Sequence, residues 1–95
     1  MKTAEWHEKH KIKLFLASLD NCWHFSPMMN GFGKQGVPDI VACINGRMVG
    51  IEVKREGKSP TPLQEHRMQE IRAAGGIAIA GTADIVIPYL RANLT

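Results

Sequence analysis

The dipeptide Asn45-Gly46 most constrains the fold, because it separates two short runs that are rich in β-branched and apolar residues. Asn-Gly between two such runs is the strongest local signal for a β-hairpin with a two-residue loop. A loop of this length fixes the strand register, so Ile44 faces Arg47 and Ala42 faces Val49. The sequence therefore predicts one defined hairpin in the middle of the chain.

Extending that register places Asp39 directly opposite Glu52. Lys54 lies two residues further along the strand, so it projects from the same face as Glu52. Two like charges with Cβ atoms only about 5 Å apart repel one another. Each residue singly would suit a solvated salt-bridge cluster, but the shared register, common face and apolar flanks favour a metal site. A hard cation such as Mg²⁺ fits, since it binds through one or two carboxylates and keeps several waters.

The same residues carry a family resemblance. Pro38-Asp39 followed by Glu52-Val53-Lys54 resembles the PD-(D/E)xK nuclease signature. Residues 36–41, 51–55 and 61–64 together resemble the small stand-alone VRR-NUC nucleases of phages, and the similarity runs from about Glu5 to Gly76. The resemblance implies a restriction-endonuclease-like core and a DNA endonuclease that uses Mg²⁺, with Mn²⁺ able to substitute. It also implies that Asp39, Glu52 and the Val53 carbonyl hold the metal while Lys54 positions and activates the attacking water.

Residues Thr3 to Leu19 are predicted to form an amphipathic helix whose apolar stripe is Ile12, Phe15, Leu16 and Leu19. Continued backwards, this stripe reaches Glu8 and then Glu5, so both acids are expected on the face that packs on the sheet. The resemblance points to Glu5 as a helix acid of the metal site, although Glu8 is an alternative. Either acid could instead serve the helix dipole, because acidic residues are favourable in a first helical turn.

A second helix is predicted to begin at Pro62, with Thr61 as its N-cap. Gln64 follows Thr61 by three residues, which is the spacing of a capping box. Gln64 also lies on the helix stripe that faces the sheet, and the resemblance places a glutamine beside the metal pocket. Both functions are compatible. Arg67 and Arg72 are expected to point outward.

The remaining elements complete a predicted α/β fold of one domain, residues 1–95. Trp23 to Phe25 alternate as a strand does, and Ile77 to Ala80 read as a buried strand parallel to Val49–Lys54. Asp84 to Leu94 could form a last helix, although Pro88 weakens it. We expect a mixed sheet of about four strands flanked by helices.

The net charge of +3 permits binding to nucleic acid without requiring it. Candidate DNA contacts are basic residues around the predicted pocket, and a solvated surface would explain several of them equally well: Lys9, Lys13, Lys34, Arg55 and Lys58. No apolar run is long enough to span a membrane and no signal peptide is visible. Two cysteines make no disulfide framework. These features favour the cytoplasm, that of the host cell if the protein is encoded by a phage.

Branched DNA is the expected substrate, since stand-alone VRR-NUC proteins resemble Holliday junction resolvases in size and layout. DNA repair is the corresponding process. Symmetric cleavage of a four-way junction requires two active sites, so a homodimer is expected. The C-terminal stretch 85–90 is the favoured interface, with Met28 and Met29 as a second candidate. The alternatives are a catalytically silent DNA-binding module on the same fold, and a flap-cleaving or nonspecific nuclease.

Overall fold

A four-stranded sheet with the order β1-β2-β3-β4 forms the centre of the molecule. This computed structural model describes residues 1–28 and 33–95. The strands are β1 (Cys22–Phe25), β2 (Ile40–Ile44), β3 (Arg47–Val53) and β4 (Ile77–Gly81), and the helices are α1 (Ala4–Ala17), α2 (Pro62–Ala73) and α3 (Ala83–Leu94). The first three strands are antiparallel and β4 runs parallel to β3. The predicted mixed α/β sheet of four strands is therefore confirmed.

The central hairpin has the predicted register, with Ile44 opposite Arg47 and Ala42 opposite Val49. Asn45 and Gly46 both have positive φ, 50° and 82°, which a two-residue turn of type I′ requires. The Asn45 side chain also donates a hydrogen bond to the Leu94 carbonyl at 2.6 Å. The hairpin tip is thus anchored to the C-terminal end of the chain.

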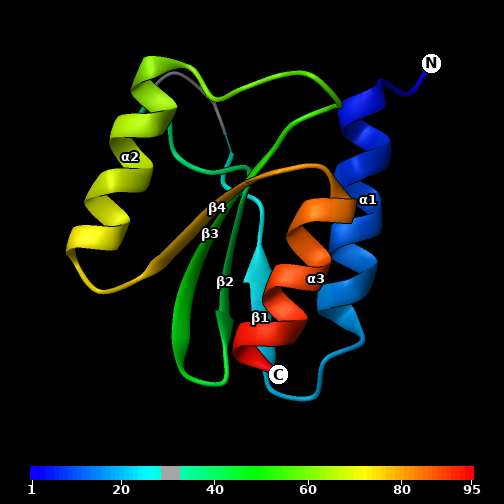
Figure 1. The fold of residues 1–95 in the computed structure, drawn as a ribbon, viewed down its shortest axis with the longest axis vertical. Helices are drawn as coiled ribbons and strands as arrows, with labels where there is room; N and C mark the ends of the chain where they lie inside the picture. Colours follow the sequence, from blue (N-terminus) through cyan, green and yellow to red (C-terminus); the bar gives the residue numbers. More distant parts are fainter. Residues whose placement is uncertain (29–32) are drawn as a thin grey trace.

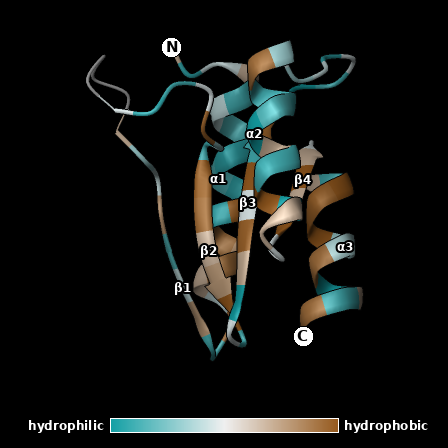
Figure 2. Ribbon diagram, turned by 90° about the vertical axis from the view of Figure 1, so that its left-hand side faces the viewer, coloured by the Kyte–Doolittle hydropathy of each residue, from teal (hydrophilic) through white to brown (hydrophobic). Residues whose placement is uncertain are grey.

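The helices cover the two faces of the sheet unequally. In Figure 1, α1 and α3 lie side by side over one face, while α2 stands alone on the other. The main core lies beneath α1 and α3 and contains the alternating residues Ile40, Ala42, Ile44, Val49, Ile51 and Val53. Figure 2 shows β2, β3 and much of α3 as hydrophobic, whereas α2 is largely hydrophilic. In the part of the chain that the structure describes, the helix on the second face, α2, packs against β3 and β4.

The C-terminal helix α3 forms despite Pro88 in its interior. Ala83, Val86, Leu90 and Leu94 recur at helical spacing and are buried. Pro88 lies on the exposed side. Packing of the apolar stripe therefore outweighs the backbone hydrogen bond that Pro88 cannot donate. The predicted last helix is formed over its full length although Pro88 weakens it. No helix among the residues described is both long enough and apolar enough to cross a membrane.

Candidate functional site

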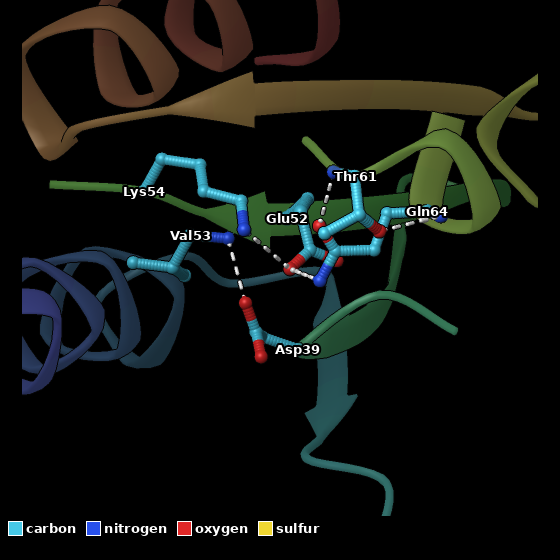
Figure 3. A network of polar contacts seen from close by, with 6 residues as sticks. All are labelled: Asp39, Glu52, Val53, Lys54, Thr61 and Gln64. Carbon is cyan, nitrogen blue, oxygen red and sulfur yellow. Dashed lines mark hydrogen bonds and ion pairs between the residues drawn. The ribbon is translucent and has the colours of Figure 1, made fainter. Parts of the chain in front are cut away.

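Asp39 sits immediately before β2, at the end of the hairpin ladder. The last paired residues are Ile40 and Ile51, so Asp39 and Glu52 are the next residues along the two strands. The Asp39 Oδ2 atom accepts a hydrogen bond from the Val53 backbone N–H at 2.8 Å. The N–H and C=O of one strand residue point to the same side, so the Val53 carbonyl also points towards Asp39. This bond fixes the aspartate at the edge of β3 (Figure 3).

Glu52 is the one buried carboxylate among the described residues, with only 2% of its surface exposed. Its Oε1 atom accepts a hydrogen bond from Gln64 Nε2 at 3.0 Å and lies 3.9 Å from Lys54 Nζ. Its Oε2 atom is buried and has no hydrogen-bond partner in the described part of the chain. A buried carboxylate oxygen without a partner is costly, because water no longer compensates its charge.

The environment of Glu52 opposes its ionisation. Burial, together with the nearby Asp39 carboxyl, raises the pKa of Glu52 to about 8, and the Lys54 ammonium offsets only part of this rise. Glu5 adds a smaller effect of the same sign as Asp39. A carboxyl with this pKa holds a proton at neutral pH unless a cation takes the proton's place. The electrostatic environment of Glu52 therefore favours a bound proton at neutral pH and would favour a bound cation in the same way.

Gln64 performs both of the functions that the sequence left compatible. Its Oε1 atom accepts from the Thr61 N–H at 2.9 Å and the Thr61 hydroxyl accepts from the Gln64 N–H at 3.2 Å, which closes the capping box of α2. Its Nε2 atom is then free to donate to Glu52. The cap fixes the amide orientation, so the start of α2 positions one oxygen of the central glutamate (Figure 3).

The two acids of α1 have separate environments. Glu8 accepts a hydrogen bond from the Ala83 N–H at 2.8 Å, which lowers the pKa of the Glu8 carboxyl. It thereby caps α3, whose own N-cap residue, Thr82, makes no side-chain capping bond. Glu5 instead lines a cavity of about 350 Å³ together with Lys54. The structure therefore places Glu5, and not Glu8, near the candidate site.

The oxygen atoms that could hold a metal ion belong to two carboxylates and a carbonyl. No group of three or more His, Cys, Asp or Glu side chains that could share an ion occurs within residues 1–28 and 33–95. Glu5 is thus near Asp39 and Glu52 but does not complete a three-carboxylate cluster with them. Two carboxylates and a carbonyl suit Mg²⁺, which binds few protein oxygens and keeps its waters. The unpartnered Oε2 atom of Glu52 is the observation that fits this ion.

The predicted DNA-contacting residues fall into three places. Lys9 lines a cavity of about 300 Å³ together with Asp39 and Gln64, and Lys13 lies one turn further along α1. Arg55 and Lys58 line the Glu5–Lys54 cavity. Lys34 lines a separate groove of about 750 Å³ beneath α2, so it is not part of the cavity that contains Asp39. Three of the five basic residues, Lys9, Arg55 and Lys58, therefore line cavities that contain Asp39 or Glu5.

Arg67 has a function that the sequence did not reveal. It was expected to point outward, but only 20% of its side chain is exposed. Its Nε atom donates to the Gln35 carbonyl at 2.8 Å, while its Nη1 atom pairs with Glu70. Gly36, the next residue, has a φ of 75° and packs against Leu63. The segment leading to Asp39 is therefore held against α2 by contacts for which the sequence contains no spacing signal.

Known proteins share this fold. One solved structure described as "VRR_NUC domain" superposes with a TM-score of 0.80 at 20% sequence identity, over 97% of this chain and 98% of its own. Another, "VRR_NUC domain protein", has a TM-score of 0.77 at 19% identity, over 97% of this chain and 88% of its own. No family model matches the sequence, and no curated protein matches it. The chain thus has the fold of a VRR_NUC domain along nearly its full length.

Proposed function

We propose that this chain is a nuclease of the VRR-NUC type, an endonuclease that hydrolyses DNA phosphodiester bonds with the help of Mg²⁺ or Mn²⁺. One observation carries the proposal: the buried, unpartnered Oε2 atom of Glu52 beside Asp39. A DNA-binding protein without catalysis would have no use for a buried carboxylate that destabilises the fold. The fold shared with VRR_NUC domains supports the same conclusion.

Each residue of the site then has a defined task. Asp39, Glu52 and the Val53 carbonyl would hold the ion, and Gln64 orients Glu52 through its 3.0 Å hydrogen bond. When bound, the ion supplies Lewis acidity and a better water nucleophile. Lys54 Nζ holds the attacking water and stabilises the negative charge on the phosphate. Water adds to phosphorus and releases a proton to solvent, while the bond to O3′ breaks and O3′ takes up a proton from solvent, which leaves a 5′-phosphate and a 3′-hydroxyl.

The remaining proposals concern the substrate and the assembly. We infer that branched DNA, above all a four-way junction, is cleaved by a homodimer. The need for two active sites in the symmetric cleavage of a four-way junction supports this, because the candidate site described above is a single one. Glu5 adds negative charge to the pocket, and Arg55 and Lys58 bind the DNA backbone next to Lys54.

The decisive experiment compares labelled linear, flapped and four-way DNA incubated with Mg²⁺, Mn²⁺, Ca²⁺ or EDTA. We expect cleavage with Mg²⁺ and Mn²⁺, and binding of Ca²⁺ with little cleavage. Asp39→Asn, Glu52→Gln and Lys54→Ala should each reduce cleavage by at least about a hundredfold, since each removes a group that acts on the transition state.

The matched control is Asp20→Asn, which neutralises an exposed acid outside the site. It should cleave as the wild type does. Wild-type rates in any one of the three site variants would refute the site. Absence of cleavage on every DNA, with retained DNA binding, would favour the silent DNA-binding module.

A further inference from the structure

A stripe of aromatic and basic side chains runs along the outer side of α1, away from the apolar stripe that packs on the sheet. Its members recur at helical spacing and line a surface cavity of about 440 Å³; we call them the α1 patch, which consists of Trp6, Lys9, His10, Lys13 and Leu14. Trp6 and Leu14 remain exposed, at 37% and 59%. None of these five residues, all of which the structure describes, has an acidic side chain.

The aromatic part of the patch is already organised. The Trp6 indole and the His10 imidazole are stacked, with ring centroids 4.9 Å apart and an angle of 10° between the planes. The Lys2 ammonium lies over the indole, 4.5 Å from the ring centroid. A flat aromatic surface accompanied by ammonium groups combines two features that bind unpaired nucleotides: bases stack on the rings and phosphates meet the charges.

The patch adjoins the candidate catalytic cavity through one residue. Lys9 lines the α1 patch and also lines the cavity that contains Asp39 and Gln64. A strand bound along α1 would therefore pass Lys9 and reach the carboxylate pair. A purely solvated helix face would not require a tryptophan stacked on a histidine beside the site.

We propose that the α1 patch binds unpaired nucleotides of the DNA strand that enters the active site. This inference rests on the proposed nuclease function and narrows its branched substrate: the nucleotides next to the cleaved bond are unpaired, as in a flap or at a branch point that has opened. Trp6 and His10 stack with bases, and Lys9 and Lys13 contact the phosphates.

Tryptophan fluorescence tests the stacking directly, because the chain contains two tryptophans, Trp6 and Trp23. Trp23 lies on β1, outside the patch, and is 68% exposed. In a Glu52→Gln background without metal, the Trp23→Phe variant retains Trp6 as its only indole. We expect a single-stranded oligonucleotide to quench its emission. The Trp6→Phe variant, which retains Trp23, should show no quenching. Quenching of Trp23 alone would overturn the proposal.

Affinity measurements test the contribution of each side chain. Trp6→Ala should weaken binding of tailed DNA roughly tenfold or more, as loss of one stacked base does, and should leave binding of a blunt duplex nearly unchanged. The double variant Lys9→Ala/Lys13→Ala should reduce the salt dependence of binding by about 1.4 units of log–log slope, since each of the two lost phosphate contacts to a single strand removes about 0.7.

Lys11→Ala is the matched charge control, because Lys11 is on the same helix but pairs with Glu8 at 3.4 Å. It should change neither the affinity nor the slope. Equal loss of tailed and blunt DNA binding in Trp6→Ala would overturn the inference. These measurements need no cleavage, so a failed nuclease assay would refute the proposed function and leave the patch to be judged by its own result.

Discussion

Two glutamates of this protein respond to their surroundings in opposite directions. Burial and the neighbouring Asp39 raise the pKa of Glu52 to about 8, whereas a backbone hydrogen bond from Ala83 lowers the pKa of Glu8. Glu8 therefore stabilises the fold when it is ionised, and its contribution is lost as the pH falls through its lowered pKa. Ionised Glu52 destabilises the fold. Glu8 thus contributes to the stability of the fold, whereas Glu52 belongs to the candidate site.

The pH dependence of stability should reveal Glu52. The native protein binds a proton at Glu52 up to a pH of about 8, while the unfolded chain releases it near 4.5. The native state therefore binds more protons in this window, and the free energy of unfolding falls as the pH rises from about 4.5 to about 8. In EDTA, Glu52→Gln should melt roughly 5 °C or more above the wild type at pH 8, and close to it at pH 5.

Thermal melts between pH 5 and pH 8.5 provide the measurement. In the control variant Asp20→Asn, the difference in melting temperature from the wild type should be the same at every pH. Added Mg²⁺ should raise the melting temperature of the wild type most at pH 8, where it replaces the proton, and should have little effect on Glu52→Gln. If the difference in melting temperature between Glu52→Gln and the wild type did not vary with pH, this would contradict the raised pKa of Glu52.

The sequence predicted the pairing of Asp39 with Glu52 and Lys54 because two rules of local geometry suffice. A two-residue turn sets the register, and the period of two puts alternate residues on one face. The hydrogen bond from Ala83 to Glu8 joins residues 75 positions apart, so no local rule contains it. Sequence reasoning therefore left Glu5 and Glu8 as alternatives, and only the packing of α3 against α1 separates them.

At the scale of elements, α1 presents one acid to the site and one to its neighbouring helix. Glu8→Ala should lower the stability by about 1 to 2 kcal/mol, as loss of a helix cap does, and the melting temperature by roughly 5 to 10 °C. Its cleavage rate below the melting transition should stay near that of the wild type. Glu5→Ala should show the reverse: nearly unchanged melting and a cleavage rate reduced by about tenfold or more.

Paired melting curves and single-turnover cleavage assays on the two variants decide this prediction, and each variant is the control for the other. Loss of activity without loss of stability in Glu8→Ala would mean that Glu8 is the helix acid of the site after all. Equal stability losses in both variants would show that Glu5 has a structural function in α1.

Helix α2 shows how one local motif can define a remote geometry. The capping box was readable from Thr61 and Gln64, because its spacing is fixed by the first helical turn. The same glutamine amide also reaches Glu52, and this contact depends on where α2 packs against β3. The docking involves Gly36 against Leu63 and Arg67 against the Gln35 carbonyl, neither of which follows a periodic pattern. Periodicity thus located the helix and its inner face, while tertiary contacts decided which side chains the helix brings together.

At the scale of the molecule, the exposed apolar surface differs from the sequence-based expectation. The stretch 85–90 appeared more apolar than one helix requires, but Val86 and Leu90 are fully buried in the core. Ile85 and Tyr89 remain exposed, at 56% and 40%. Met28 is 83% exposed, and Met29 lies outside the described residues. The expected interface on α3 therefore shrinks to its outer side, because a small domain needs most of its apolar residues for one core.

A second exposed apolar region borders α2, on the sheet face that this helix covers only in part. Phe25, Met28 and Met48 line the groove of about 750 Å³ there, and all three are exposed. The two regions offer different dimers. An α3 interface would pack the helices of two copies together, whereas an interface in the groove would join the open sheet faces. Charged substitutions of exposed residues in each region distinguish the two candidate interfaces without disturbing the core.

Assembly and cleavage of a four-way junction are expected to depend on one another. A monomer with one active site makes one cut per binding event, whereas a dimer with twofold symmetry presents two sites to symmetric strands. We expect a dimer at micromolar concentration by light scattering, and paired nicks within the lifetime of one complex. Ile85→Glu together with Tyr89→Glu should yield a monomer that nicks one strand at a time, while Met48→Glu should remain dimeric. Dissociation by Met48→Glu instead would move the interface to the sheet face. A wild-type monomer with uncoupled nicks would contradict the dimer and favour a flap-cleaving or nonspecific nuclease.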